Sequence, residues 1–148
     1  MKRGIVVYDS RSGSTKKVAE TIAVAADFEI VHVKDAPLNL EAYSLLVVGS
    51  LNIHAHPSDK IIVYLSEVNA PKQCAVFVTF GMPLLGQISS LQCLREMRNA
   101  LLAKGSSCLG GFICPGYHVK FKTHKGRPSD KDLVRAQRFA KEILKRSK

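Results

Sequence analysis

Short apolar runs and amphipathic helical stretches alternate along the chain, and this alternation restricts its fold more than any other feature. Residues 45–49 and 75–80 are apolar throughout or nearly so, which is typical of strands covered on both faces. Residues 16–26 and 87–104 instead carry apolar side chains at helical spacing. The alternation predicts an α/β domain built around a mostly parallel sheet.

The same pattern gives the expected elements in chain order. We expect strands over 4–8, 28–33, 45–49, 75–80 and 108–114, and helices over 16–26, 58–68, 87–104 and 129–146. Residues 38–42 leave room only for a short crossover turn. Spacing places Ile61, Ile62, Leu65 and Val68 of the second helix on its buried stripe, and Ile88, Leu91, Leu94, Leu101 and Leu102 of the third. Gly110 and Gly111 predict close packing or a bend in the last strand.

The length of 148 residues fits a single domain, 1–148, with one substantial core. The opening MKRGIVVYDS has no long apolar run and no small-residue cleavage site, and no stretch is apolar enough to span a bilayer, so we expect a cytoplasmic protein. The four cysteines lack metal-type spacing, and we expect reduced, buried, inert thiols.

The formal net charge of +10 is concentrated near the end of the sequence. Residues 120–148 contain eleven basic and three acidic residues, whereas residues 1–119 are close to balanced. Such a surface attracts nucleic acid, anionic lipid or an acidic protein, and charge alone does not choose among them. An ordinary solvated helix face explains it equally well.

Ligands of open parallel sheets bind outside the carboxyl ends of the strands, so the loops after Tyr8, Gly49, Phe80 and Cys114 are the candidate site. The first loop carries hydroxyls around a glycine and leads directly into a helix. Its residues are Ser10, Arg11, Ser12, Gly13, Ser14 and Thr15. A phosphate needs hydroxyl and amide donors that converge at a helix N-terminus, which this loop offers beyond what a helix cap requires.

Other phosphate-binding signatures are absent from this loop. It lacks the Gly-Lys-Ser/Thr ending of a nucleoside triphosphate loop and the three spaced glycines of a dinucleotide site. A phosphate-accepting receiver domain would place an aspartate after the third strand, where this chain has Gly49 and Ser50.

The segment Ser10-x-Ser12-Gly13-Ser14-Thr15 resembles the phosphate motif of flavodoxins. The late segment 126–128, with Asp132-Leu133, Ala136 and Phe139-Ala140, also resembles the closing segment of many bacterial and archaeal members of that family. The resemblance runs nearly end to end. It implies a flavodoxin-like three-layer α/β/α sandwich with a five-stranded parallel sheet in the order 2-1-3-4-5, and non-covalently bound FMN as the cofactor.

By this resemblance, the first loop would hold the FMN phosphate, with Arg11 adding charge. The flavin ring would lie between the second and third loops, formed by Ser50, Leu51, Asn52, Ile53 and His54, and by Thr79, Phe80, Gly81 and Met82. Backbone groups at Asn52, Phe80 and Gly81 would bind the ring edges, and Leu51, His54, Phe80 or Met82 would cover its faces. The chain has no tryptophan, so the tryptophan and tyrosine sandwich common in flavodoxins is not available.

Two further segments allow more than one reading. The pair His54 and His56 has a metal-like spacing, but without further ligands we expect contact with the flavin or simple exposure, and no metal. The segment 117–127 mixes aromatic, histidine and lysine residues, which fits a flap near the flavin or a surface for an anionic partner.

Three functions therefore remain in order of preference. The first is an electron carrier whose redox partner protein has an acidic docking face; nucleic acid is the less favoured partner. The second is a self-contained FMN oxidoreductase acting on quinones, porphyrinogens or tetrapyrroles, although short loops leave little chain for a substrate pocket. The third is a non-redox interaction domain that kept the fold without the cofactor.

Overall fold

A five-stranded parallel sheet forms the centre of the computed structural model, which describes residues 2–82, 84–117, 122 and 124–147. Its strands are β1 (Lys2–Tyr8), β2 (Glu29–His32), β3 (Tyr43–Leu51), β4 (Gln73–Phe80) and β5 (Ser107–Pro115). They lie in the order β2-β1-β3-β4-β5, and every neighbouring pair is parallel. The predicted fold class and strand order are confirmed.

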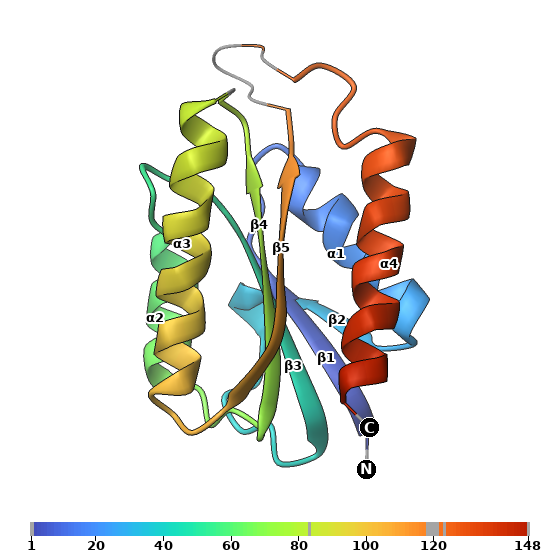
Figure 1. The fold of residues 1–148 in the computed structure, drawn as a ribbon. Coiled ribbons are helices and arrows are strands. Elements are labelled where there is room, and N and C mark those ends of the chain that lie inside the picture. Colours follow the sequence, from blue (N-terminus) through green and yellow to red (C-terminus); the bar gives the residue numbers. More distant parts are fainter. Residues whose placement is uncertain (1, 83, 118–121, 123, 148) are drawn as a thin grey trace.

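Two layers of helices cover the sheet (Figure 1). The helices are α1 (Ser14–Ala26), α2 (Asp59–Glu67), α3 (Leu85–Leu102) and α4 (Asp130–Arg146). Helices α1 and α4 lie on one face and α2 and α3 on the other. The crossover from β2 to β3 contains no α-helix, as its short length predicts. It holds the 3-10 turn η1 (Val33–Asp35), which lies before the expected turn at 38–42, and an isolated bridge between Asn39 and Asn69. Within the described ranges, no helix combines the length and apolar character that a bilayer crossing requires.

The alternating side chains of the central strands build two separate cores. Along β3, Leu46 and Val48 point to the α2 and α3 side, while Leu45 and Val47 point to the α1 and α4 side, and all four are buried. A sheet covered on both faces requires such continuous apolar strands. The uninterrupted runs in the sequence therefore correspond to the middle of the sheet.

A glycine near the end of β3 makes room for Phe77, the largest fully buried side chain among the described residues. Gly49 pairs with Phe77 of β4, and a Cβ atom at Gly49 would lie 1.9 Å from the Phe77 ring. Phe77 is fully buried in the α1 and α4 core. The residue that precedes the second predicted ligand loop is thus fixed by packing, since any side chain there would displace the ring.

The buried faces of α2 and α3 differ from the prediction at four positions. Ile62, Ile88, Leu91 and Leu102 are exposed, with Ile88 67% and Leu91 52% accessible. The stripe of α3 that faces the sheet is instead Gly86, Ser90, Cys93, Met97 and Leu101. Leu94 and Leu101 do pack inward as expected, as do Ile61, Leu65 and Val68.

Hydrogen bonds at the start of α3 explain why this helix is rotated about its axis relative to the prediction. The Ser90 hydroxyl donates to the carbonyl oxygen of Gly86 at 2.6 Å, and the Asn52 amide donates to the Ser90 hydroxyl at 3.2 Å. The backbone of Gly86 also lies close to Met82, since a Cβ atom at Gly86 would be only 3.0 Å from Cβ of Met82. These contacts require the small residues of α3 to face inward, so the larger apolar residues on its other side face solvent.

The prediction of buried cysteines holds for three of the four. Cys74, Cys93 and Cys114 are buried and Cys108 is half-buried on β5, with all four thiols free. Burial raises the pKa of Cys93 and of Cys114 to about 12, so both remain protonated and unreactive at neutral pH. The register between β4 and β5 shifts after Cys108, at the position of the predicted glycine bend.

Replacing Gly49 with alanine is expected to lower the free energy of unfolding by about 2 to 3 kcal/mol, because the new methyl group overlaps the Phe77 ring. Urea denaturation measures the loss. Gly110→Ala is the control, since its Cβ would lie at an ordinary 3.4 Å from Phe139. Equal stability of the two variants would contradict the packing argument.

Alkylation of the folded protein is expected to modify Cys108 first, because the other three thiols are buried. Intact mass after brief iodoacetamide treatment should show one addition in buffer and four in urea. Preferential labelling of Cys74, Cys93 or Cys114, located by peptide mapping, would contradict this expectation and show that the fold opens locally around that residue.

Candidate functional site

Three predicted ligand loops meet at the carboxyl edge of the sheet. The backbone N–H of Asp9, after β1, donates to the carbonyl of Gly49 at 3.1 Å. The N–H of Asn52, after β3, donates to the carbonyl of Thr79 at 2.9 Å, and the hydroxyls of Thr15 and Thr79 are 2.7 Å apart. Parallel pairing of β1, β3 and β4 therefore brings these loops into direct contact.

The first loop places its hydroxyls around the start of α1. Gly13 is the N-cap residue with φ 93°, a left-handed conformation that favours glycine, and its N–H donates to the Ser10 hydroxyl at 3.1 Å. The Ser12 hydroxyl donates to that of Ser14 at 3.1 Å. Among the residues that the structure describes, no side chain caps the helix, and its first turn has no acidic residue, so its positive end is open to an anion.

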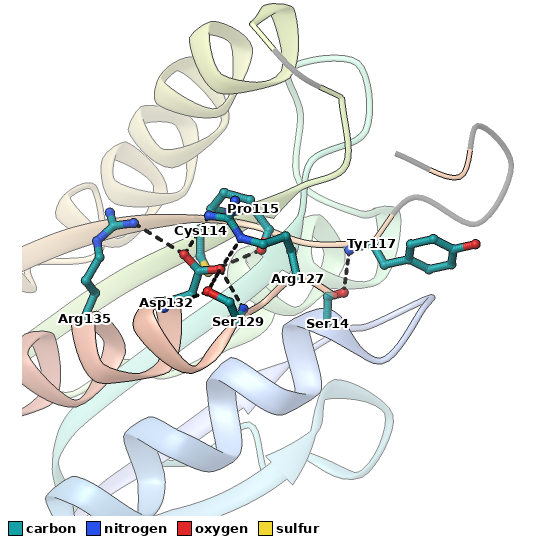
Figure 2. A network of polar contacts seen from close by, with 8 residues as sticks. All are labelled: Ser14, Cys114, Pro115, Tyr117, Arg127, Ser129, Asp132 and Arg135. Atoms are coloured by element: carbon teal, nitrogen blue, oxygen red, sulfur yellow. Dashed lines mark hydrogen bonds and ion pairs between the residues drawn. The ribbon is translucent and has the colours of Figure 1, made fainter. Parts of the chain in front are cut away.

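A cavity of about 260 Å³ opens beside this helix start. It is lined by Ser12, Gly13, Ser14, Lys17, Tyr117, Gly126, Arg127 and Pro128. The backbone N–H of Tyr117 donates to the Ser14 hydroxyl at 3.0 Å and so connects the end of β5 to the first loop (Figure 2). Hydroxyls, two cationic side chains and a helix N-terminus surround one small space.

The sequence prediction covers only part of this cavity. It includes Ser12, Gly13 and Ser14 but not Lys17, Tyr117 or Arg127. Lys17 follows Ser14 by three residues, and helical geometry alone places side chains three apart on one face. Arg11 is exposed and lies outside the lining.

The Arg127 side chain is held by an ion pair with Asp132. Nη2 of Arg127 donates to Oδ1 of Asp132 at 2.7 Å, and Nε donates to Oδ2 (Figure 2). Asp132 also accepts from the backbone N–H of Ser129, while its own N–H donates to the Ser129 hydroxyl, which forms a capping box on α4. The segment that resembles the closing segment of the flavodoxin family thus holds Arg127 in position at the cavity.

These contacts also change the acidity of Asp132, which is 2% exposed. Burial opposes its ionisation, but the hydrogen bonds from Arg127 and Ser129 outweigh that effect and lower its pKa to about 2. Asp132 therefore stays ionised over the whole physiological range and keeps Arg127 in place.

The second loop is fixed mainly by its own polar contacts. Asn52 donates through its amide to Ser89 and Ser90 of α3 and accepts from the N–H of Ala55. The buried Ser50 hydroxyl accepts from the N–H of Ser58 at 2.9 Å and supports the start of α2. Leu51 and Ile53 are half-buried. The side chains of Ser50 and Asn52 thus hold the loop.

The two histidines of this loop face different surroundings. His54 is exposed with φ 50°, whereas Nδ1 of His56 lies 3.2 Å from Glu96 of α3. Within the described residues, no group of three or more histidine, cysteine or acidic side chains is arranged to hold a metal ion.

The third loop begins with a buried aromatic ring. Phe80 packs edge-to-face against His124 with ring centroids 5.7 Å apart, and its carbonyl accepts from the N–H of Gly116. Nδ1 of His124 is buried and has no hydrogen-bond partner among the described residues. Gly81 is half-buried and Met82 exposed beside them. Of the predicted flap over 117–127, residues 118–121 and 123 lie outside the described residues.

A family model described as a flavodoxin domain matches residues 5–124. The chain belongs to the flavodoxin family. A protein of Methanocaldococcus jannaschii described as uncharacterized is 32% identical over 97% of this chain and 99% of its own length. The matched residues include the serine-rich loop, and the family assignment confirms the resemblance to flavodoxins, while the closing segment lies beyond the matched residues.

Solved structures of flavodoxins share the fold. A flavodoxin from the domain Archaea superposes with a TM-score of 0.74 and 21% identity, covering 98% of each chain. Oxidised flavodoxin 1 from Bacillus cereus gives a TM-score of 0.77 and 19% identity, covering 97% of this chain and 98% of that one. At this identity the superpositions support the architecture, while the roles of individual loop residues stay predictions.

The wild-type protein is expected to lose about 2 kcal/mol of unfolding free energy through Asp132 as the pH falls from about 4 to about 2. The folded pKa lies below the unfolded value of 3.8, so the contribution is present above that value and disappears on acidification. Asp132→Asn should lack this contribution at neutral pH and decline less in acid. The exposed Asp130→Asn serves as the control, and identical acid profiles for wild type and Asp132→Asn would contradict this account.

Proposed function

We propose that this flavodoxin-family protein binds FMN non-covalently and carries electrons between redox partners. The cavity beside the N-terminus of α1 is the observation that carries the proposal. The contact between Thr15 and Thr79 joins the predicted phosphate loop beside it to the third ligand loop. Bound FMN would supply the electron-carrying chemistry, and the chain would bind and orient it.

The donors of the cavity fit a phosphate monoester. Ser12 and Ser14 bring hydroxyls, the open start of α1 brings backbone N–H groups, and Lys17 brings a full positive charge. Arg127 adds a second cation whose charge is partly balanced by Asp132. A phosphate of charge near −2 would therefore find complementary charge and several hydrogen-bond donors.

One buried polar atom further supports a ligand at this edge. Nδ1 of His124 lacks a hydrogen-bond partner among the described residues, and a buried polar group without one is costly. Its ring packs against Phe80, in the third predicted loop. A heterocycle bearing hydrogen-bonding groups would satisfy that nitrogen, whereas an apolar ligand would not.

The partner is proposed to present an acidic face. The chain carries a net charge of +10, and its excess lies in the last thirty residues or so, including α4. Opposite charges on two proteins accelerate their encounter and fix their orientation. An acidic electron donor or acceptor would therefore associate faster than a basic one, with a strong dependence on salt.

Lys17→Glu is expected to weaken FMN binding by about tenfold or more while changing the affinity for riboflavin little, because riboflavin lacks the phosphate. Quenching of flavin fluorescence measures both affinities. Lys16→Glu is the matched control, since Lys16 is exposed on the same helix turn, carries the same charge and does not line the cavity.

Three results would contradict the proposal. If the wild-type protein did not bind FMN, the third function, a non-redox interaction domain, would be favoured. If Lys17→Glu weakened the binding of FMN and of riboflavin equally, the phosphate would have to lie away from Lys17. Steady-state oxidation of NAD(P)H by the FMN-loaded protein alone, without a partner reductase, would favour the self-contained oxidoreductase.

A further inference from the structure

A second and larger cavity lies outside the candidate site, between the edge strand β5 and helix α4. It has a volume of about 440 Å³. Its lining is formed by Gly110, Gly111, Phe112, Arg135, Arg138, Phe139, Glu142, Ile143 and Arg146. We call it the arginine groove. It shares no lining residue with the cavity at the start of α1.

The base of the groove is aromatic and rigid. The rings of Phe112 and Phe139 stack with centroids 5.4 Å apart, and the guanidinium carbon of Arg135 lies 5.3 Å from the centre of the Phe112 ring. Gly110 lies beside the helix, where even a Cβ atom would make only an ordinary contact of 3.4 Å with Phe139. The groove is thus held open by packed side chains from β5 and α4.

Its three arginines differ in how far their charge is already paired. Arg146 contacts Glu142 at 3.3 Å and donates to the carbonyl of Leu109 at 2.7 Å. Arg135 lies 3.7 Å from Asp132, whose shorter bonds go to Arg127. Arg138 is exposed and forms no ion pair with any residue that the structure describes. A guanidinium without a partner at an aromatic surface is suited to two-pronged binding of a carboxylate.

We propose that the arginine groove binds a carboxylate-rich segment of a partner protein, with Arg138 as its principal contact. Positive charge exceeds negative charge among the lining residues, so an acidic segment is electrostatically complementary. The stacked phenylalanines offer apolar surface to the stems of glutamate or aspartate side chains.

The lining fits a polypeptide better than a nucleic acid. Single-stranded nucleic acid binds through free aromatic faces on which bases stack, whereas Phe112 is already engaged by Phe139 and Arg135. Glu142 also lies in the groove and would repel a continuous phosphate backbone. A peptide can vary its side chains along its length and so avoid this repulsion.

The position of the groove separates partner attachment from the cofactor site. Helix α4 begins near the carboxyl edge of the sheet, where the ligand loops lie, and runs away from it (Figure 1). Arg138 lies at the middle of this helix and Arg146 at its end. A bound segment would therefore anchor a partner without covering that edge. The inference does not depend on FMN, because no residue of the groove contributes to the proposed phosphate site.

Fluorescence anisotropy with a short labelled peptide, in which glutamates alternate with uncharged residues, tests the proposal on the intact protein. Arg138→Glu is expected to raise the dissociation constant by about tenfold or more at low salt. Lys141→Glu is the matched control, since it makes the same change in charge on an exposed position of the same helix outside the groove. Its effect should stay below about threefold.

A labelled single-stranded oligonucleotide of equal charge provides the second arm. Weaker binding of this oligonucleotide than of the peptide, together with peptide binding that is lost only in Arg138→Glu, supports the proposal. No peptide binding by the wild type, or equal loss in both variants, would overturn it. Tighter oligonucleotide binding that Arg138→Glu abolishes would assign the groove to nucleic acid instead. Circular dichroism of both variants verifies that each is folded.

Discussion

The parallel pairing of β1, β3 and β4 is the constraint on which the rest of the molecule depends. Parallel strands end on the same side of a sheet, so three loops far apart in the sequence must meet at one edge. The register then sets which atoms touch, since Tyr8 lies beside Gly49 and Leu51 beside Thr79. In this register the hydroxyls of Thr15 and Thr79 come within hydrogen-bonding distance, 2.7 Å apart. The position of these polar groups at the edge therefore follows from the packing of strands whose central residues are apolar and buried.

A single ion pair extends this arrangement to the last helix. Asp132 caps α4 and holds Arg127, and Arg127 lines the cavity into which Ser12 and Lys17 also reach. A loss of the Asp132 charge would weaken the helix start and release the arginine at the same time. Stability of α4 and electrostatics of the cavity are thus coupled through one buried carboxylate, because its Oδ2 accepts both from Nε of Arg127 and from the backbone N–H of Ser129.

Periodicity in the sequence was sufficient to predict the sheet and its helices, but it did not fix how α3 is rotated. A strand buried on both faces has one apolar pattern, whereas α3 has apolar residues on two sides, and Ile88 and Leu91 fit an inward stripe as well as Cys93 and Met97 do. The rotation of α3 is set by Asn52, a loop residue whose amide donates a hydrogen bond to the Ser90 hydroxyl.

The cavity at the start of α1 gives a similar case. Its serine-rich loop was visible in the sequence, while Arg127 and Tyr117 reach the same cavity only through tertiary contacts. Local patterns predict elements, and long-range polar contacts set their orientation.

The basic excess near the end of the chain does not behave as one uniform surface. Arg127 is neutralised internally by Asp132, and Arg146 is shared between Glu142 and a backbone carbonyl. Arg138 lies on the same helix as Arg146, but it has neither a carboxylate nor a backbone carbonyl as a partner among the described residues. Because a paired guanidinium has already exchanged its water for fixed acceptors, it gains less from a new carboxylate than an unpaired one does. Binding strength on such a surface should therefore follow the arginines whose charge is unpaired, and a count of basic residues would overestimate it.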